Sequence, residues 1–107
     1  MGGPDDLKVP IIDESQYLEL DKVDKVTVFT FLKDLGISQQ NLYFINALQN
    51  EGWKVVAWLD HRDVSANQKA VAINRKYPRT TLRLQIDYGV DGNDGAENFR
   101  GTVYLYR

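Results

Sequence analysis

In the segment ISQQNLYFINALQNEGWKVVAWLD, residues 37–60, the spacing of the apolar residues changes halfway along. Ser38 is a favourable N-cap residue, and Gly52 suits the left-handed position that ends many helices. Between them, four apolar residues fall within one helical stripe: Leu42, Phe44, Ile45 and Leu48. From Trp53 the apolar period becomes two, which predicts a strand over 53–60. We therefore expect a helix–turn–strand unit onto which the rest of the chain packs.

The predicted strand alternates between two faces. One face carries Trp53, Val55, Ala57 and Leu59, and the other carries Lys54, Val56, Trp58 and Asp60. The first face is uniformly apolar and is expected to be core. Trp58 on the mixed face then needs either a cover or a partner. On the helix, Tyr43 lies off the apolar stripe and is expected to be partly exposed.

The segment before this unit, DKVDKVTVFTFLKDL (residues 21–35), carries two conflicting signals. Its run of β-branched and aromatic residues favours a strand over about 25–32, because such side chains lose rotamer freedom in a helix. Asp21 and Asp24, however, have the spacing of N-cap and N3 residues, and Gly36 stands where a helix would end. We prefer the strand and keep a helix over 22–35 as the alternative.

A second helix is predicted over 66–76. Ser65 and Gln68 have capping-box spacing, apolar residues then recur at helical intervals, and Pro78 ends the pattern. A strand over Lys69–Arg75 is the alternative, because AVAI is compact and apolar. The cap and the spacing favour the helix.

Two strands close the chain. Residues 80–88 alternate cleanly, with Leu82, Leu84 and Ile86 inward, and residues 100–106 repeat the pattern. A loop, GVDGNDGAEN, joins them into a long-looped hairpin. The order strand–helix–strand–helix–strand–strand predicts an α+β fold, a two-layer sandwich with two helices on one face of a mainly antiparallel sheet of about four strands.

Length and composition indicate one domain. With 107 residues, 43% hydrophobic and 26% charged, the chain has the make-up of an ordinary globular domain. Residues 1–12, broken by Pro4 and Pro10, are expected to be a flexible lead-in to a domain over 13–107. The first residues lack a secretion-signal pattern, and no apolar run approaches the roughly 18 residues that span a membrane. We expect no membrane contact and favour a cytoplasmic location.

The sequence offers little for catalysis. It has no Cys, and its one His, His61 in the turn DHRD, has no second His or ligand spacing beside it. Asp91, Asn93 and Glu97 superficially resemble a calcium loop, but Gly95 stands where the pattern requires an acidic residue, so a hairpin turn is favoured. No glycine pattern of a phosphate-binding loop occurs. We therefore expect no metal, no cofactor and no catalytic site; an enzyme site near residues 60–63 is the least favoured hypothesis.

The outward face of the predicted sheet is the stronger candidate for a functional surface. If the strands 53–60, 80–88 and 100–106 share a sheet, their outward side chains form an aromatic and arginine-containing face: Trp58, Arg83, Gln85, Tyr104 and Tyr106. Trp, Tyr and Arg are the residues enriched in protein interfaces. The leading hypothesis is a non-catalytic module that contacts another protein, or a second copy of itself, through this face or through a sheet edge. Ordinary cross-strand pairing on a solvated sheet explains the same residues without a partner.

A basic segment supports a second hypothesis. Residues 61–83 hold six Lys and Arg residues and one acidic residue, although the whole chain has a net charge of −2. A nucleic-acid-binding domain would use the basic 69–83 segment together with the sheet aromatics, and its basic patch would be Lys69, Arg75, Lys76 and Arg79. The simpler explanation is that this patch pairs with the acidic N-terminal segment.

Overall fold

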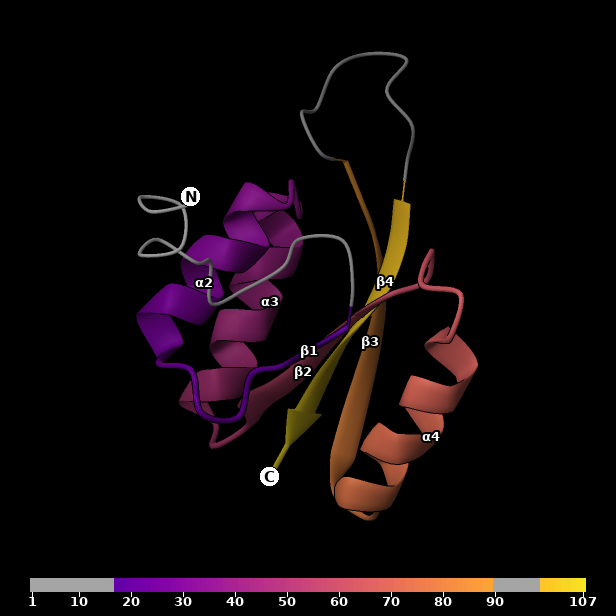
Figure 1. The fold of residues 1–107 in the computed structure, drawn as a ribbon. Coiled ribbons are helices and arrows are strands. Elements are labelled where there is room, and N and C mark those ends of the chain that lie inside the picture. Colours follow the sequence, from indigo (N-terminus) through magenta and orange to yellow (C-terminus); the bar gives the residue numbers. More distant parts are fainter. Residues whose placement is uncertain (1–16, 90–98) are drawn as a thin grey trace, which may run out of the picture.

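The computed structural model describes residues 17–89 and 99–107. In chain order its elements are β1 (Leu18–Glu19), α2 (Lys25–Asp34), α3 (Gln39–Asn50), β2 (Lys54–Asp60), α4 (Ala66–Lys76), β3 (Thr81–Tyr88) and β4 (Phe99–Tyr106). The strands form one antiparallel sheet in the order β1-β2-β4-β3 (Figure 1). The predicted α+β class, with an antiparallel sheet of four strands, is confirmed.

The helices cover both faces of the sheet, which is more than the predicted two layers. The helices α2 and α3 lie on one face and α4 lies on the other (Figure 1). Buried apolar residues accordingly form two clusters: a main cluster centred on Trp58 under α2 and α3, and a smaller α4-side cluster of Val56, Ala57, Leu59, Ile73 and Tyr104. The helix predicted between Ser38 and Gly52 and the helix predicted over 66–76 thus lie on opposite faces, because β2 presents apolar side chains to both.

The strand preferred over 25–32 is wrong, and the helix alternative is correct. The carboxylate of Asp24 caps α2 by accepting hydrogen bonds from the backbone N–H and the hydroxyl of Thr27, at 2.9 and 2.8 Å. Val28, Phe31 and Leu32 form its buried stripe. After the helix, Gly36 has a φ of 94°, where a side chain would be strained. Capping and helical spacing of apolar residues therefore outweigh the β-branched composition.

The helix α3 begins and ends as predicted. The hydroxyl of Ser38 accepts a hydrogen bond from the backbone N–H of Asn41 at 3.2 Å, and Gly52 has a φ of 100°. The buried stripe is narrower than predicted: Leu42 and Ile45 are buried, but Phe44 is 52% exposed. We attribute the exposure of Phe44 to the packing of α3, which meets the sheet along one side only. The helix surface covered by this contact is narrower than the predicted apolar stripe.

A bulge in β2 overturns the predicted faces of that strand. Val55 pairs with Leu105 and Ala57 pairs with Tyr104, so Val56 is an extra residue. Such an insertion reverses the alternation beyond it. Trp58 therefore joins Val55 in the main cluster, and Ala57 and Leu59 point toward α4. Strict alternation along the sequence contains no sign of this bulge, so it assigns Trp58 to the wrong face of the sheet.

The remaining elements follow the sequence pattern, except that the short strand β1 was not predicted. The helix α4 spans Ala66–Lys76 as expected, although the hydroxyl of Ser65 donates to Asp63 and does not cap the helix. The strands β3 and β4 form the predicted antiparallel pair, with Leu84 opposite Val103 in the main cluster. Both the lead-in 1–12 and the calcium-like stretch around Asp91 lie outside the described residues.

Candidate functional site

The predicted aromatic face is brought together only in part, and α4 covers it. In the sheet Arg83 lies opposite Tyr104, and Gln85 lies opposite Thr102, so the four predicted residues of β3 and β4 share one face. Tyr104 is 3% exposed and belongs to the α4-side cluster, and the ring of Tyr106 packs on Tyr77 with a centroid distance of 4.9 Å. The aromatic side chains of this face therefore serve mainly to hold α4.

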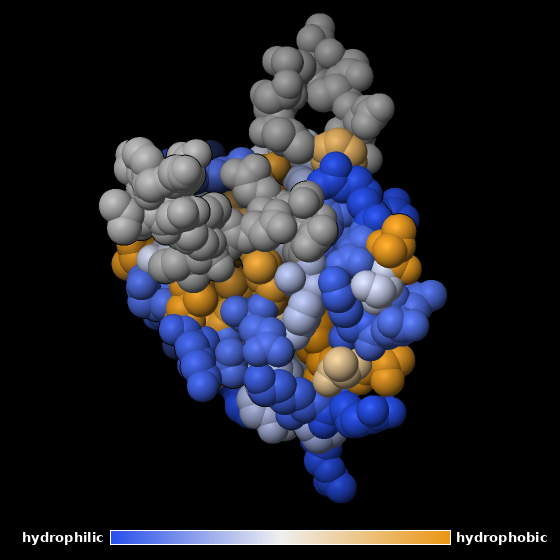
Figure 2. All heavy atoms as spheres, viewed as in Figure 1, coloured by the Kyte–Doolittle hydropathy of each residue, from blue (hydrophilic) through white to orange (hydrophobic). Residues whose placement is uncertain are grey.

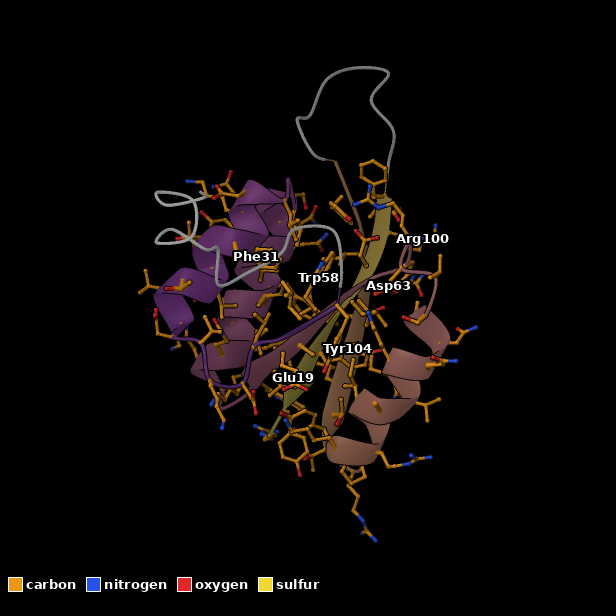
Figure 3. All side chains as sticks on the ribbon, in the orientation of Figure 1. Glu19, Phe31, Trp58, Asp63, Arg100 and Tyr104 are labelled. Carbon is orange, nitrogen blue, oxygen red and sulfur yellow. The ribbon has the colours of Figure 1, made fainter. Side chains whose placement is uncertain are left out.

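Trp58 is separated from that face. It is fully buried in the main cluster, with edge-on contacts to the rings of Phe31 at 6.4 Å and Tyr88 at 5.2 Å. Figure 3 shows Trp58 and Phe31 on the α2/α3 side of the sheet and Tyr104 on the α4 side. A Cβ at Gly101 would overlap the Trp58 ring, so the glycine makes room for it. Trp58 therefore has a cover from its own chain and offers no surface to a partner.

The basic patch is half neutralised by acidic residues. Lys69 forms an ion pair with Asp63, and Lys76 lies 3.7 Å from Glu19 and 3.4 Å from Asp21. The hydroxyl of Tyr77 also donates a hydrogen bond to Asp21, and this bond helps to lower the pKa of that carboxyl. Pairing between the basic segment and the acidic N-terminal segment, the simpler of the two explanations, is thus observed at Lys76.

Two arginines of the patch remain open. Arg75 and Arg79 are exposed, and neither makes an ion pair within residues 17–89 and 99–107. Arg83, on β3, donates a hydrogen bond to the side-chain oxygen of Asn74 at 2.9 Å. The cations available to a polyanion in this region are therefore few and are spread over α4 and its C-terminal turn.

An ion pair with a buried carboxylate and a half-exposed guanidinium lies where β2 ends. Asp60 is fully buried, and Arg62 donates to both of its carboxylate oxygens, the shorter bond being 2.7 Å. The hydroxyl of Tyr88 also donates a hydrogen bond to Asp60, and the Arg62 guanidinium lies 3.9 Å from the centre of the Phe99 ring. We call Asp60, Arg62 and Tyr88 the Asp60 network.

Electrostatics favours the charged form of this pair. Burial alone would raise the pKa of Asp60, but hydrogen bonds from Arg62 and Tyr88 outweigh it and lower that pKa. Burial and the hydrogen bond to Asp60 together raise the pKa of the Tyr88 hydroxyl. The network therefore holds a fixed carboxylate and a fixed cation, an arrangement that organises the turn after β2.

The neighbouring residue His61 is exposed and takes part in local structure. Its Nε2 atom lies 2.7 Å from the hydroxyl of Thr102, and its backbone N–H donates to the carbonyl oxygen of Arg100 at 2.9 Å. Within the described part of the chain, no group of three or more His, Asp or Glu side chains could hold a metal ion. The turn thus presents hydrogen bonds that tie β2 to β4.

The surface that sequence reasoning missed lies on the helix pair. Six large hydrophobic residues of the described chain are exposed, and four of them belong to α2 and α3: Val26, Phe29, Tyr43 and Phe44. Figure 2 shows hydrophobic residues exposed over α2 at the left edge of the view. Finding Phe29 and Val26 required assigning 25–34 as helix, and the exposure expected for Tyr43 was the one signal in the sequence.

Two hollows adjoin these residues. The first, of about 390 Å³, lies between α2 and α3, and we call it the helix-pair hollow; its lining is Phe29, Lys33, Ile37, Gln39, Leu42 and Tyr43. The second, of about 180 Å³, lies between α3 and the edge strand β3, with Phe44 at its border; its lining is Asn41, Phe44, Ile45, Arg83, Leu84, Gln85 and Ile86. Together they place exposed apolar groups next to concave surface on two sides of α3.

Comparisons with other proteins add no constraint. No protein-family model matches the chain, and neither the curated proteins nor the solved structures contain a match to it. Among the described residues, no helix combines the length and the apolar character needed to cross a membrane. Any statement about function therefore depends on the geometry above.

Proposed function

We propose that this protein is a non-catalytic module that binds another protein through the helix-pair hollow. The observation that carries the proposal is the exposure of Phe29 and Tyr43, 40% and 68%, at the border of a hollow lined by Ile37 and Leu42. Grouped apolar side chains on a concave surface are a mark of protein contact sites. Their exposure in the free chain costs solvation free energy, which a partner would recover by covering them.

The lining also indicates the chemistry of the partner. Lys33 is the one charged residue of the hollow, and within the described residues it makes no ion pair. A segment that places an apolar side chain between Phe29 and Tyr43, and a carboxylate near Lys33, would satisfy both parts of the surface. We therefore expect the partner to present a bulky apolar residue next to Asp or Glu.

Selection from a random-peptide display library tests this expectation. The wild-type chain should enrich peptides with an apolar residue beside an acidic one, and a purified peptide should lose at least tenfold in affinity for Phe29→Ala/Tyr43→Ala. Lys33→Glu should weaken the same peptide, whereas Val71→Ala, which truncates an exposed apolar residue on α4, should not. Peptides that bind the double variant as tightly as the wild type, or no enrichment at all, would reject the hollow as the site.

A nucleic-acid partner is the weaker proposal. Its support is the exposure of Arg75 and Arg79; against it stand the pairing of Lys69 and Lys76 with acidic residues and the burial of Tyr104. Binding through phosphate contacts must weaken steeply as salt is added. An oligonucleotide affinity that falls with salt and is lost in Arg75→Ala/Arg79→Ala would favour it over the protein partner.

A further inference from the structure

The strand β3 has one unpaired side. It lies at the edge of the sheet and, among the described residues, pairs only with β4. Alternate residues of this eight-residue strand therefore present N–H and C=O groups at the open edge, next to the hollow that Phe44, 52% exposed, borders. A long edge strand is a template for another strand unless charges or a covering segment block it. The charges on this edge are Arg83 and Asp87, both exposed.

These two charges are arranged so that the strand complements itself. In an antiparallel pair, residues directly opposite each other share a face of the sheet. When a two-fold axis relates the two strands, one residue must therefore lie on the axis, opposite the same residue of the second copy. With Gln85 on the axis, Arg83 of each copy lies opposite Asp87 of the second copy. The axis thus creates two ion pairs from one register.

The same register matches the apolar face. Leu84 then lies opposite Ile86 of the second copy, and Leu82 lies opposite Tyr88, all on the side of the main cluster. Moving the axis to Leu84 places Arg83 opposite Gln85, and moving it to Ile86 places Arg83 opposite Gly89, so both ion pairs are lost. Charge complementarity therefore selects Gln85 as the residue on the axis.

Arg83 and Asp87 each have a partner within their own chain, and both keep hydrogen-bonding capacity for an ion pair with the second copy. Asp87 accepts a hydrogen bond from Arg100 at 3.0 Å, and the two side chains of this pair are 65% and 58% exposed. A carboxylate has two oxygens and can take a second cation. Arg83 is held toward α4 by one hydrogen bond to Asn74, and further donors of its guanidinium stay free for a carboxylate across the edge.

We propose that two copies of this chain associate by antiparallel pairing of β3 with β3, with Gln85 on the two-fold axis. The two sheets become one continuous sheet, and each Arg83 pairs with Asp87 of the second copy. The two Phe44 side chains border the β3–β3 interface on the α3 side. The interface is distinct from the helix-pair hollow, so it stands or falls independently of the proposed function.

Charge reversal tests the register. By light scattering over a concentration series, the wild type should move from monomer to dimer, and Arg83→Asp should remain monomeric because it faces Asp87. The swap Arg83→Asp/Asp87→Arg should recover the dimer, because the opposite charges meet again. Arg79→Asp, a reversal outside the strand, should behave as the wild type. A monomeric wild type at every concentration, or a swap that does not recover, would overturn the proposal.

A cysteine at the axis gives an independent readout. The chain has no Cys, so Gln85→Cys introduces a single thiol. Residues directly opposite in an antiparallel pair have Cβ atoms about 4.5–5.5 Å apart, so a small approach of the two strands reaches the roughly 3.5–4.5 Å that a disulfide spans. Mild oxidation should link two copies of Gln85→Cys at least tenfold faster than two copies of Thr81→Cys, whose thiols face Gly89 and which keep both ion pairs. Equal rates for the two variants would contradict this axis, and unaltered circular dichroism would show that both variants fold.

Discussion

On the α2/α3 face of the sheet a large apolar cluster carries the packing and the Asp60 network lies at its border, whereas on the α4 face a small apolar cluster is surrounded by polar contacts. The main cluster contains fourteen buried residues of the described chain, and the α4-side cluster contains five. Around α4, Tyr77 and Lys76 contact Asp21, and Asn74 contacts Arg83. Burial of apolar side chains therefore positions α2 and α3, while hydrogen bonds and ion pairs help to position α4.

The main cluster should give the largest effect on stability. Trp58→Ala removes a fully buried indole that contacts Phe31 and Tyr88, and we expect a loss of about 3–5 kcal/mol in the free energy of unfolding. Urea denaturation followed by circular dichroism measures it. The control is Tyr43→Ala, whose side chain is mostly exposed and should change stability by about 0.5 kcal/mol or less. A Trp58 variant no weaker than this control would contradict the assignment of Trp58 to the core.

The α4 layer should respond less to truncation. Ile73 is its buried apolar anchor, and Ile73→Ala should cost about 2–3 kcal/mol, the lower part of the range for such substitutions, because few side chains surround it. The difference between the faces should also appear in hydrogen exchange: amides of α4 should open at lower free energy than those of α3. Ile73→Ala that costs as much as Trp58→Ala would remove the distinction.

The sequence predicts features that depend on neighbouring residues better than features that depend on contacts between distant parts of the chain. Caps and helical spacing act between near neighbours, so Ser38, Gly52 and the β3 alternation could be read correctly. The bulge at Val56 depends on the register between β2 and β4, a property of contacts distant in the chain. Without it, Trp58 is assigned to the wrong face, and the predicted site loses its central residue.

The candidate surface was missed for a related reason. Phe29 and Phe44 are apolar residues in or beside apolar runs, and period alone assigns such residues to the core. Their exposure follows from the side on which α2 and α3 meet the sheet and each other, which is a tertiary property. The ion pair of Lys76 with Glu19 and Asp21 was foreseeable only as a balance of charge between two segments.

The Asp60 network should make stability depend on pH in acid. The folded-state pKa of Asp60 is lowered below the ordinary value of about 3.9, so its contribution is present above that value and is lost as pH falls through the lowered pKa. Asp60→Asn should cost about 2 kcal/mol at pH 7 and flatten this part of the acid limb. Urea denaturation midpoints of the wild type and the variant, measured between roughly pH 2 and pH 7, show how much of the pH dependence Asp60 contributes. The matched control is Asp34→Asn on the exposed face of α2; an unchanged acid limb in the Asp60 variant would contradict the network.

The polar contacts around α4 should give the smallest effect, and their salt dependence separates them from burial. Asp21→Asn removes the negative charge that pairs with Lys76 and leaves Tyr77 a weaker, neutral amide acceptor. We expect a loss of about 0.5–1 kcal/mol at low salt, since the pair is partly solvated. Added salt screens the ion pair in the wild type but leaves the hydrogen bond of Tyr77, so the difference between variant and wild type should shrink without vanishing. Tyr77→Phe should show a loss that salt does not change, because it deletes only the hydroxyl. If salt left the Asp21→Asn difference untouched, α4 would be held there by the hydrogen bond alone, and the ion pair with Lys76 would contribute nothing to the contrast between the two faces.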